Sequence, residues 1–359
     1  MPNRLTHSVV LTAALILSAT ACAADPMIKL QVGGQWREGK PLLWTDAEVT
    51  LLRRDGQLLD FAPSQAENYS AVPAGFRSYS AAEMRADLVQ EFGHGFEVGG
   101  SGHYVVVYPA GQRDLWATRF EQLYRSFVHY FKARGWSPPE PQFPLVAIVF
   151  PRQADFQQHT QREGVRAQNG LLGYYSPYTN RVLLYDVTAG RSGGDWTTNA
   201  ETIIHEAAHQ TAFNTGLHSR FGQSPRWVVE GLGTMFEAPG VWNSLQHPQR
   251  SARINRSQLE AFRKYAQSRR SKNAIGELVS SDRPFQSDIH GAYAESWALS
   301  FFLSESEPRK YLQYLMKTSA VKPFEAYRSP QRLQDFTDVF GVNLAMLDAR
   351  FLRFIAELK

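Results

Sequence analysis

The chain has 359 residues, of which 43% are hydrophobic and 13% are aromatic. These fractions are typical of a globular protein with a substantial core, and they exclude an intrinsically disordered chain. The formal net charge is only +4. We therefore expect no nucleic-acid partner, because such proteins concentrate basic residues on one face.

Residues 1–24 have the pattern of an export signal. Arg4 precedes the short apolar run Val9–Ile16, and small residues then lead to Ala21-Cys22-Ala23. This pattern predicts a signal peptide, and hence an exported protein of the periplasm or cell envelope. The run is too short to cross a bilayer, and no later segment reaches the roughly 18 apolar residues of a transmembrane span. The mature chain is thus expected to lack a transmembrane helix.

Cys22 is the only cysteine in the sequence. A lone cysteine excludes disulfide bonds within the mature chain and a cysteine nucleophile in its active site. Two interpretations stay open for this residue. It is either the acylated first residue of a lipoprotein, and so a lipid anchor, or an incidental residue of the signal.

A small β module is expected over residues 25–64. Ile28, Leu30 and Val32 alternate with polar neighbours, and Asp55-Gly56 separates two strand-like runs as a tight hairpin turn does. Residues 65–80 are rich in Ser, Ala, Pro and Gly, and their composition predicts a linker.

The larger domain is expected over residues 81–359, with an α/β part at 81–196 and a helical part at 197–359. Apolar residues recur at steps of three and four over 113–134, which predicts a helix. The strand-like segments of the α/β part are 103–108, 143–150, 173–175 and 181–187. The expected fold class is therefore α+β, with a mixed or antiparallel sheet and a helical C-terminal lobe.

The helical part opens with the most informative segment of the chain. Thr198-Asn199-Ala200-Glu201 has the form of a capping box, which marks a helix start, and Gly216 is a natural stop. His205-Glu206-Ala207-Ala208-His209 lies within this apolar helix. Positions i and i+4 share one helix face, so both imidazoles can bind one zinc ion. Glu206 would lie beside the open coordination position and take a proton from metal-bound water.

A catalytic zinc needs a third protein ligand, and Glu230 is the candidate. Ser224-Pro225 predicts a second helix, with Ser224 as its N-cap. A carboxylate 21 positions after His209 on an antiparallel helix can return to the metal. Gly231 and Gly233 would let the two helices approach closely. We therefore expect one zinc per chain.

These motifs resemble the gluzincin metallopeptidases of the MA clan, the group of thermolysin and the aminopeptidases. The resemblance rests on His205-Glu206-x-x-His209 with Glu230-Gly231, on Asn214 five positions after His209, and on the helix-like segment 293–303. Over about 100–302 the chain also resembles exported bacterial gluzincin-like proteins of unassigned function.

The resemblance implies a gluzincin zincin fold and zinc-dependent hydrolysis of peptide bonds, with Glu206 as base and Tyr293 as an oxyanion donor. The implied partner is a peptide or protein substrate, within the cell envelope for an exported enzyme. A Gly-x-Met-Glu-Asn segment for the substrate amine is absent from the sequence. The choice between endopeptidase and exopeptidase therefore stays open.

The sequence also permits functions other than a peptidase. The main alternative is a non-catalytic envelope-binding protein whose zinc site is structural or inert. His218 could substitute as a ligand, although a surface role is expected because it follows the Gly216 stop. Gly190–Gly194 matches the nucleophile-elbow pattern of serine esterases, but the helix begins too late for that motif.

Further side chains have two open roles each. Thr234 and Glu237 either orient the metal ligands or are ordinary surface residues. Tyr174, Tyr175 and Tyr178 line a substrate cleft or belong to the strand core. A basic segment is expected to be a solvated face, with an anionic envelope partner as the alternative; it comprises Arg250, Arg253, Arg256, Arg263, Lys264, Arg269, Arg270 and Lys272.

Overall fold

The structure is a computed structural model that describes residues 25–112, 116–165, 171–187 and 197–359. The expected signal peptide, its cleavage region and Cys22 lie outside the described residues, as do Gly190–Gly194. The described chain forms two compact units. The first comprises residues up to 52 together with 60–77, and the second comprises residues 53–59 and 78–359.

The N-terminal residues form a five-stranded sheet in the order β4-β3-β2-β1-β5. Its strands are β1 Met27–Val32, β2 Gln35–Trp44, β3 Val49–Leu52, β4 Leu58–Phe61 and β5 Ala66–Val72, with a short 3-10 helix, η1, at Pro63–Gln65. Ile28, Leu30 and Leu51 are buried. The expected hairpin turn is present, with the Gly56 N–H donating to the Arg53 carbonyl. This sheet confirms the N-terminal β region.

Strand β5 falls within residues 65–80, for which the composition predicted a linker. It pairs with β1 in antiparallel register from Met27–Val72 to Val32–Ala66. Most of its side chains are exposed. The strand is therefore defined by backbone hydrogen bonds and not by apolar burial, which is why its polar sequence concealed it.

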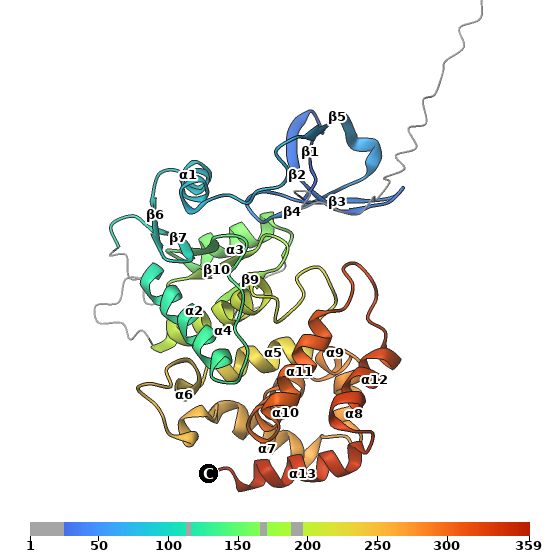
Figure 1. Ribbon diagram of the computed structural model, residues 1–359. Helices are drawn as coiled ribbons and strands as arrows, with labels where there is room; N and C mark the ends of the chain where they lie inside the picture. The colour runs from blue at the N-terminus through green and yellow to red at the C-terminus, as the bar shows by residue number, and fades with distance from the viewer. Residues whose placement is uncertain (1–24, 113–115, 166–170, 188–196) are drawn as a thin grey trace, which may run out of the picture. The chain divides into compact units, whose positions relative to one another are not determined.

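The second unit contains a mixed sheet in the order β6-β7-β8-β10-β9 (Figure 1). Its strands are β6 Phe96–Ser101, β7 Tyr104–Pro109, β8 Leu145–Phe150, β9 Gly173–Ser176 and β10 Arg181–Tyr185. The three central strands are parallel, and the two outer strands run antiparallel to their neighbours. This arrangement confirms the predicted α+β class, and it leaves β9 at one edge.

Helices cover both faces of this sheet. They are α1 Ala81–Phe92, α2 Trp116–Lys132, α3 Gln153–Arg162 and α4 Thr197–Asn214. Side chains of α2 and α4 share one apolar cluster with the sheet, and those of α1 and α3 contribute to the cluster on its other face. Helix α1 was missed, although Ser80 and Glu83 form a capping box at its start. This Ser-x-x-Glu signal was available in the sequence.

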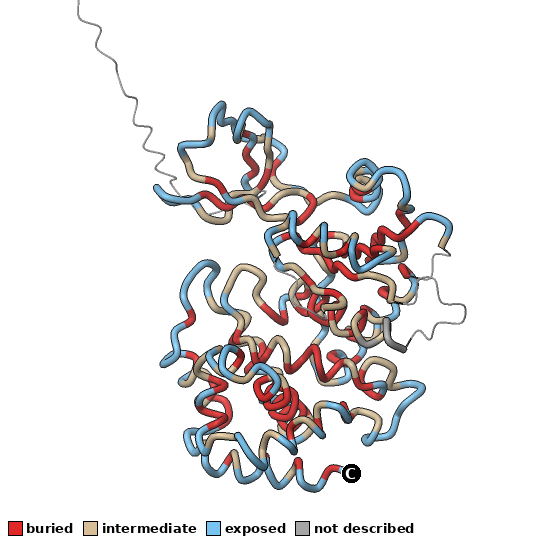
Figure 2. The backbone as a smooth tube through the Cα atoms, turned by 180° about the vertical axis from the view of Figure 1, so that it is seen from behind, coloured by how far each residue is buried: buried red, intermediate tan, exposed pale blue. Residues whose placement is uncertain are grey.

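The rest of the second unit is helical, as predicted. Its elements are α5 Arg226–Phe236, α6 Pro239–Trp242, η2 Arg250–Arg253, α7 Arg256–Ser268, α8 Ala274–Ser280, α9 Pro284–Ser287, α10 Ile289–Ser306, α11 Pro308–Ser319, α12 Ser329–Phe340 and α13 Leu344–Glu357. Helix α10 packs against α5, α7 and α11. It is buried nearly all round, so most of its turns are red in Figure 2. Its Trp297 is fully buried. Among the described residues, no helix has the length and hydropathy needed to cross a membrane.

The basic segment is not uniformly solvated. The Arg270 side chain is only 6% exposed, and it binds the buried Glu295 and Asp348 through charged hydrogen bonds. The prediction of a solvated face is therefore wrong for this residue. Its acidic partners lie on α10 and α13, which the local charge pattern did not reveal.

Candidate metal centre

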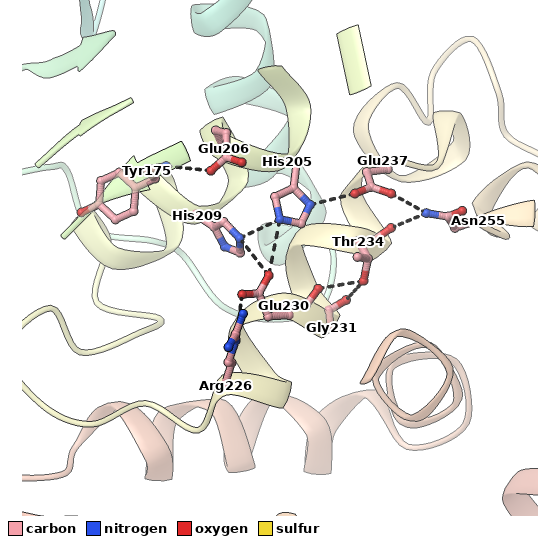
Figure 3. A network of polar contacts seen from close by, with 10 residues as sticks. All are labelled: Tyr175, His205, Glu206, His209, Arg226, Glu230, Gly231, Thr234, Glu237 and Asn255. Atoms are coloured by element: carbon pink, nitrogen blue, oxygen red, sulfur yellow. Dashed lines mark hydrogen bonds and ion pairs between the residues drawn. The ribbon is translucent and has the colours of Figure 1, made fainter. Parts of the chain in front are cut away.

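Helix α4 presents the two predicted histidines to one point. Its buried Ile204, Ala208 and Ala212 pack into the core, and the adjacent face of the helix carries His205 and His209. Their rings meet edge to face with centroids 4.5 Å apart, and the two Nε2 atoms lie 2.9 Å from each other. Figure 3 shows both rings turned toward the same side of α4.

Helix α5 brings Glu230 to the same point. Glu230 Oε2 lies 3.5 Å from His205 Nε2 and 3.6 Å from His209 Nε2. Tetrahedral zinc with ligands at about 2.0–2.1 Å holds them about 3.3–3.4 Å apart. The observed separations of 2.9, 3.5 and 3.6 Å lie on both sides of this value. Among the residues that the structure describes, His205, His209 and Glu230 form the one group whose ligand atoms converge in this way.

The start of α5 differs from the prediction by one residue. Pro225 is the N-cap, and it makes no capping side-chain hydrogen bond of its own. The Ser224 hydroxyl instead accepts a hydrogen bond from the Ser219 N–H at 3.2 Å. The prediction of Ser224 as N-cap is therefore wrong, because a turn contact competes for its hydroxyl.

The two glycines of α5 serve different helix contacts. A Cβ on Gly233 would lie 2.8 Å from His209 Cε1 and 2.9 Å from His205 Cε1. A Cβ on Gly231 would instead lie 2.6 Å from the backbone oxygen of Ser296 on α10. Residues two apart point to different sides of a helix. Gly233 thus permits the approach of α5 to the histidines, whereas Gly231 permits its packing against α10.

Glu237 holds the ring of His205 from behind. The Nδ1–H of His205 donates to Glu237 Oε1 at 2.7 Å, and the amide of Asn255 donates to Glu237 Oε2 at 2.6 Å. Because the carboxylate only accepts, Nδ1 keeps its proton, and Nε2 is the ring nitrogen of His205 that is available to a metal on the side of Glu230 and His209. Thr234 does not share this role, since its hydroxyl bonds the Glu230 backbone carbonyl at 2.7 Å.

His205 and Glu230 stabilise each other's charged forms. Burial alone would lower the pKa of His205, but hydrogen bonds with Glu230 and Glu237 outweigh it and raise this pKa well above 6.5. Burial alone would raise the pKa of Glu230, but hydrogen bonds from His205 and His209 hold it well below 4.5. The pocket is therefore suited to a carboxylate beside a positive charge, either a proton or a cation.

Glu206 lies next to the ligand group without belonging to it. Its Oε2 accepts a hydrogen bond of 2.7 Å from the backbone N–H of Tyr175 on β9 (Figure 3). Its side chain is nearly buried. Sequence reasoning could not find this contact, because a backbone donor has no residue-type signature.

Tyr293 lies on α10, beside Glu230. Burial raises the pKa of its hydroxyl, the charge of Glu230 raises it further, and a hydrogen bond with Arg226 opposes both. The Tyr293 phenol therefore stays protonated at neutral pH and can donate a hydrogen bond. Arg226 was not singled out from the sequence. Its Nε lies 3.4 Å from Glu230 Oε1.

The remaining candidate residues differ in their burial. His218 is only 1% exposed, and burial followed by the charge of His209 lowers its pKa to about 3. The surface role expected for it is wrong, because Phe213 and the end of α4 cover it. Tyr175 is buried and donates from its hydroxyl to Asn180. Tyr174 donates to Glu163, and Tyr178 is exposed.

Comparisons with known proteins give distant matches. The family model described as "Protein of unknown function (DUF1570)" matches residues 199–325, about a third of the chain. No curated protein sequence matches. Among solved structures, a mutant M1 zinc metallopeptidase from Deinococcus radiodurans aligns at 14% identity and a TM-score of 0.41, over 73% of this chain and 50% of that chain. The same mutant enzyme with a bound Tyr-Ser-Ala substrate gives 14% identity and 0.41, over 72% and 51%. The chain thus spans about half the length of these structures, which are zinc metallopeptidases.

Proposed function

We propose that this protein is a zinc-dependent hydrolase of gluzincin type, and specifically a peptidase. The observation that carries the proposal is the convergence of His205, His209 and Glu230 at separations suited to tetrahedral zinc. Glu206 lies beside this group and is not one of its ligands, as the base of a metallohydrolase must be. Bound zinc would supply a Lewis acid that activates water and polarises the scissile carbonyl.

Glu206 is the residue proposed to move the proton. Its Oε2 is held by the Tyr175 N–H at 2.7 Å, which orients the carboxylate and leaves Oε1 to accept a proton from the attacking water. The same carboxylate then returns the proton to the departing amine. Tyr293 is the proposed donor to the developing oxyanion, because its protonated hydroxyl lies beside Glu230.

A peptide substrate is favoured by the edge strand next to Glu206. Strand β9 lies at the end of the sheet order, and the N–H of Tyr175 is directed to Glu206, away from β10. The outward backbone groups of an edge strand can pair with an extended peptide. This arrangement supports hydrolysis of a peptide or protein over hydrolysis of a small ester.

We also propose that residues 81–359 form one metallopeptidase domain, exported to the periplasm or envelope after removal of residues 1–24. The support is the apolar run Val9–Ile16 and the small residues that follow it. N-terminal mass spectrometry of protein from its native host tests this. An acylated Cys22 terminus would establish the lipid anchor, and an uncleaved Met1 terminus in the cytoplasm would contradict export.

The central experiment combines metal analysis with peptide-library cleavage. The wild type should contain one zinc per chain, and His205→Ala should lose it. Glu206→Gln should retain zinc but lose hydrolysis by about 10²–10⁴-fold, the usual contribution of a general acid–base group. His247→Ala is the control, because His247 is exposed and should keep both properties.

Two outcomes would contradict the proposal in different ways. A wild-type protein that is free of zinc, and rebinds none, would exclude the metal centre. A folded, zinc-loaded wild type without activity on peptides, amides and esters would exclude the enzyme. If that protein also bound an envelope ligand as tightly as Glu206→Gln does, it would be a metal-stabilised binding protein.

A further inference from the structure

Arg226 is the first residue of α5, one helical turn before Glu230. Its guanidinium carbon lies 4.6 Å from the ring centre of Phe285 and 5.9 Å from that of Tyr293. The two rings themselves meet edge to face at 5.6 Å. The guanidinium therefore lies against both aromatic side chains, on the same side of the site as the proposed oxyanion donor.

The contact with Glu230 involves only one of the three guanidinium nitrogens of Arg226. Only Nε approaches the carboxylate, at 3.4 Å, whereas a guanidinium that clamps a carboxylate forms two parallel bonds at about 2.7–2.9 Å. The side chain of Arg226 is 41% exposed, compared with 14% for Glu230. The guanidinium also donates a hydrogen bond to the Tyr293 hydroxyl. Because a guanidinium carries five N–H groups and this side chain is partly exposed, the remaining groups can still donate to a ligand.

The position of Arg226 is also electrostatically unfavourable for the helix. A cation in the first turn opposes the helix dipole, at a cost of about 0.3–1 kcal/mol. The backbone N–H of Arg226 is bound by Asp282 Oδ1 at 3.1 Å, so the helix start is fixed by another residue. Arg226 therefore does not serve to cap α5, and the unfavourable placement suggests a role in the site.

We propose that Arg226 is a specificity-determining residue that binds a carboxylate group of the substrate. This inference rests on the peptidase function proposed above. The carboxylate is either the free C-terminus of a peptide or the side chain of an acidic residue, since both present the same planar pair of oxygens to a guanidinium. Phe285 and Tyr293 hold the guanidinium in place, so less side-chain entropy is lost on binding.

Binding to an inactive protein tests this without relying on turnover. Zinc-loaded Glu206→Gln is titrated calorimetrically with N-acetyl tetraalanine, with its C-terminal amide, and with two amidated tetrapeptides that carry glutamate or glutamine in place of the third alanine. The same titrations are repeated with two double variants, which combine Glu206→Gln with either Arg226→Gln or Arg226→Lys. Arg350→Gln is the matched control, because Arg350 is also half-exposed, lies 6.0 Å from the Phe302 ring and pairs with a glutamate.

In one of the two peptide pairs, the peptide with the free carboxylate should bind about tenfold more tightly than the peptide with the amide. This is the effect expected of a charged hydrogen bond at a partly exposed site. Arg226→Gln should abolish this preference, Arg226→Lys should retain part of it, and Arg350→Gln should leave it unchanged. The pair that shows the preference identifies a terminal or a side-chain carboxylate.

The inference is overturned if neither pair shows a preference, or if the preference survives in Arg226→Gln. Equal weakening of acidic and neutral peptides would also overturn it, because it would mean that Arg226 acts only through Glu230. Failure of the peptidase itself is recognised separately. A wild type that cleaves library peptides without regard to carboxylates refutes only the role of Arg226, whereas one that cleaves none refutes the peptidase.

Discussion

Gly233→Ala should damage the metal centre while leaving α5 intact. The added methyl carbon would lie 2.8 Å from His209 Cε1 and 2.9 Å from His205 Cε1, where ordinary contact begins at 3.4 Å. The ring of His209 would therefore have to move away by 0.6 Å (3.4 − 2.8), and the ring of His205 by 0.5 Å (3.4 − 2.9). Distances in a zinc site tolerate only about 0.2 Å of deviation.

Neither ring can retreat freely. His205 is tied to Glu237 at 2.7 Å, and His209 is only 8% exposed. We therefore expect the zinc affinity to fall by about 10–100-fold, the range seen when the support of metal ligands is removed. The helix itself should gain, since alanine is favoured over glycine in a helix interior by about 1 kcal/mol.

The assay is zinc competition with a fluorescent chelator, together with thermal unfolding of the metal-free and zinc-loaded protein. Gly231→Ala provides the contrast, because its methyl group would meet the Ser296 backbone oxygen at 2.6 Å and should lower the Tm of both forms. Gly233→Ala should lower the Tm of the zinc-loaded form more than that of the metal-free form. Wild-type zinc affinity in Gly233→Ala would refute the placement of α5 against the histidines.

Three further predictions concern the charged side chains of the metal centre and of the helical core. Glu237→Gln should weaken zinc binding by about 10–100-fold, because His205 would lose the carboxylate that orients it; chelator competition measures this, and unchanged affinity would contradict it. In metal-free protein, the raised pKa of His205 contributes stability that is fully present below pH 6.5 and is lost as the pH rises through the raised pKa. The depressed pKa of Glu230 contributes stability that is present above pH 4.5 and is lost as the pH falls through the depressed pKa. The Tm of chelator-treated protein should therefore decrease above pH 6.5, and a Tm that increases there would oppose this linkage. Arg270→Met should destabilise the protein by about 3–5 kcal/mol in urea unfolding, because Glu295 would remain buried without its partner; a loss below about 1 kcal/mol would show that Glu295 relaxes into solvent.

The convergence of His205, His209 and Glu230 could be predicted because its geometry is local. His205 and His209 share a helix face by their spacing alone, and the next helix in the chain needs only to return antiparallel for Glu230 to meet them. Helix periodicity also identified Glu237 as a candidate, two turns beyond Glu230. It could not separate Glu237 from Thr234, because the choice depends on where Asn255 enters from a later part of the chain.

The contacts of Glu206 and Arg226 could not be predicted. Glu206 is bound by the backbone N–H of Tyr175, and any residue except proline supplies such a donor. Arg226 was inconspicuous, because its significance depends on Phe285 and Tyr293, which lie about 60 residues later in the chain. Strand β5 was missed for a related reason, since its identity depends on pairing with β1 and not on its own composition.

Helix α5 connects the parts of the proposed active site through its opposite sides. Gly233 admits the two imidazoles of α4, while Gly231 fits against Ser296 and Ser300 of α10, the helix that carries Tyr293. The position of Glu230 therefore depends on the tightly packed helical core as much as on α4. Glu206 depends instead on β9, through the Tyr175 N–H. The proposed metal ligands and oxyanion donor are thus fixed by helix packing, and the proposed base is fixed by the sheet edge. The proposed hydrolysis would therefore require α4 to keep the helical core and the sheet in a fixed relative position.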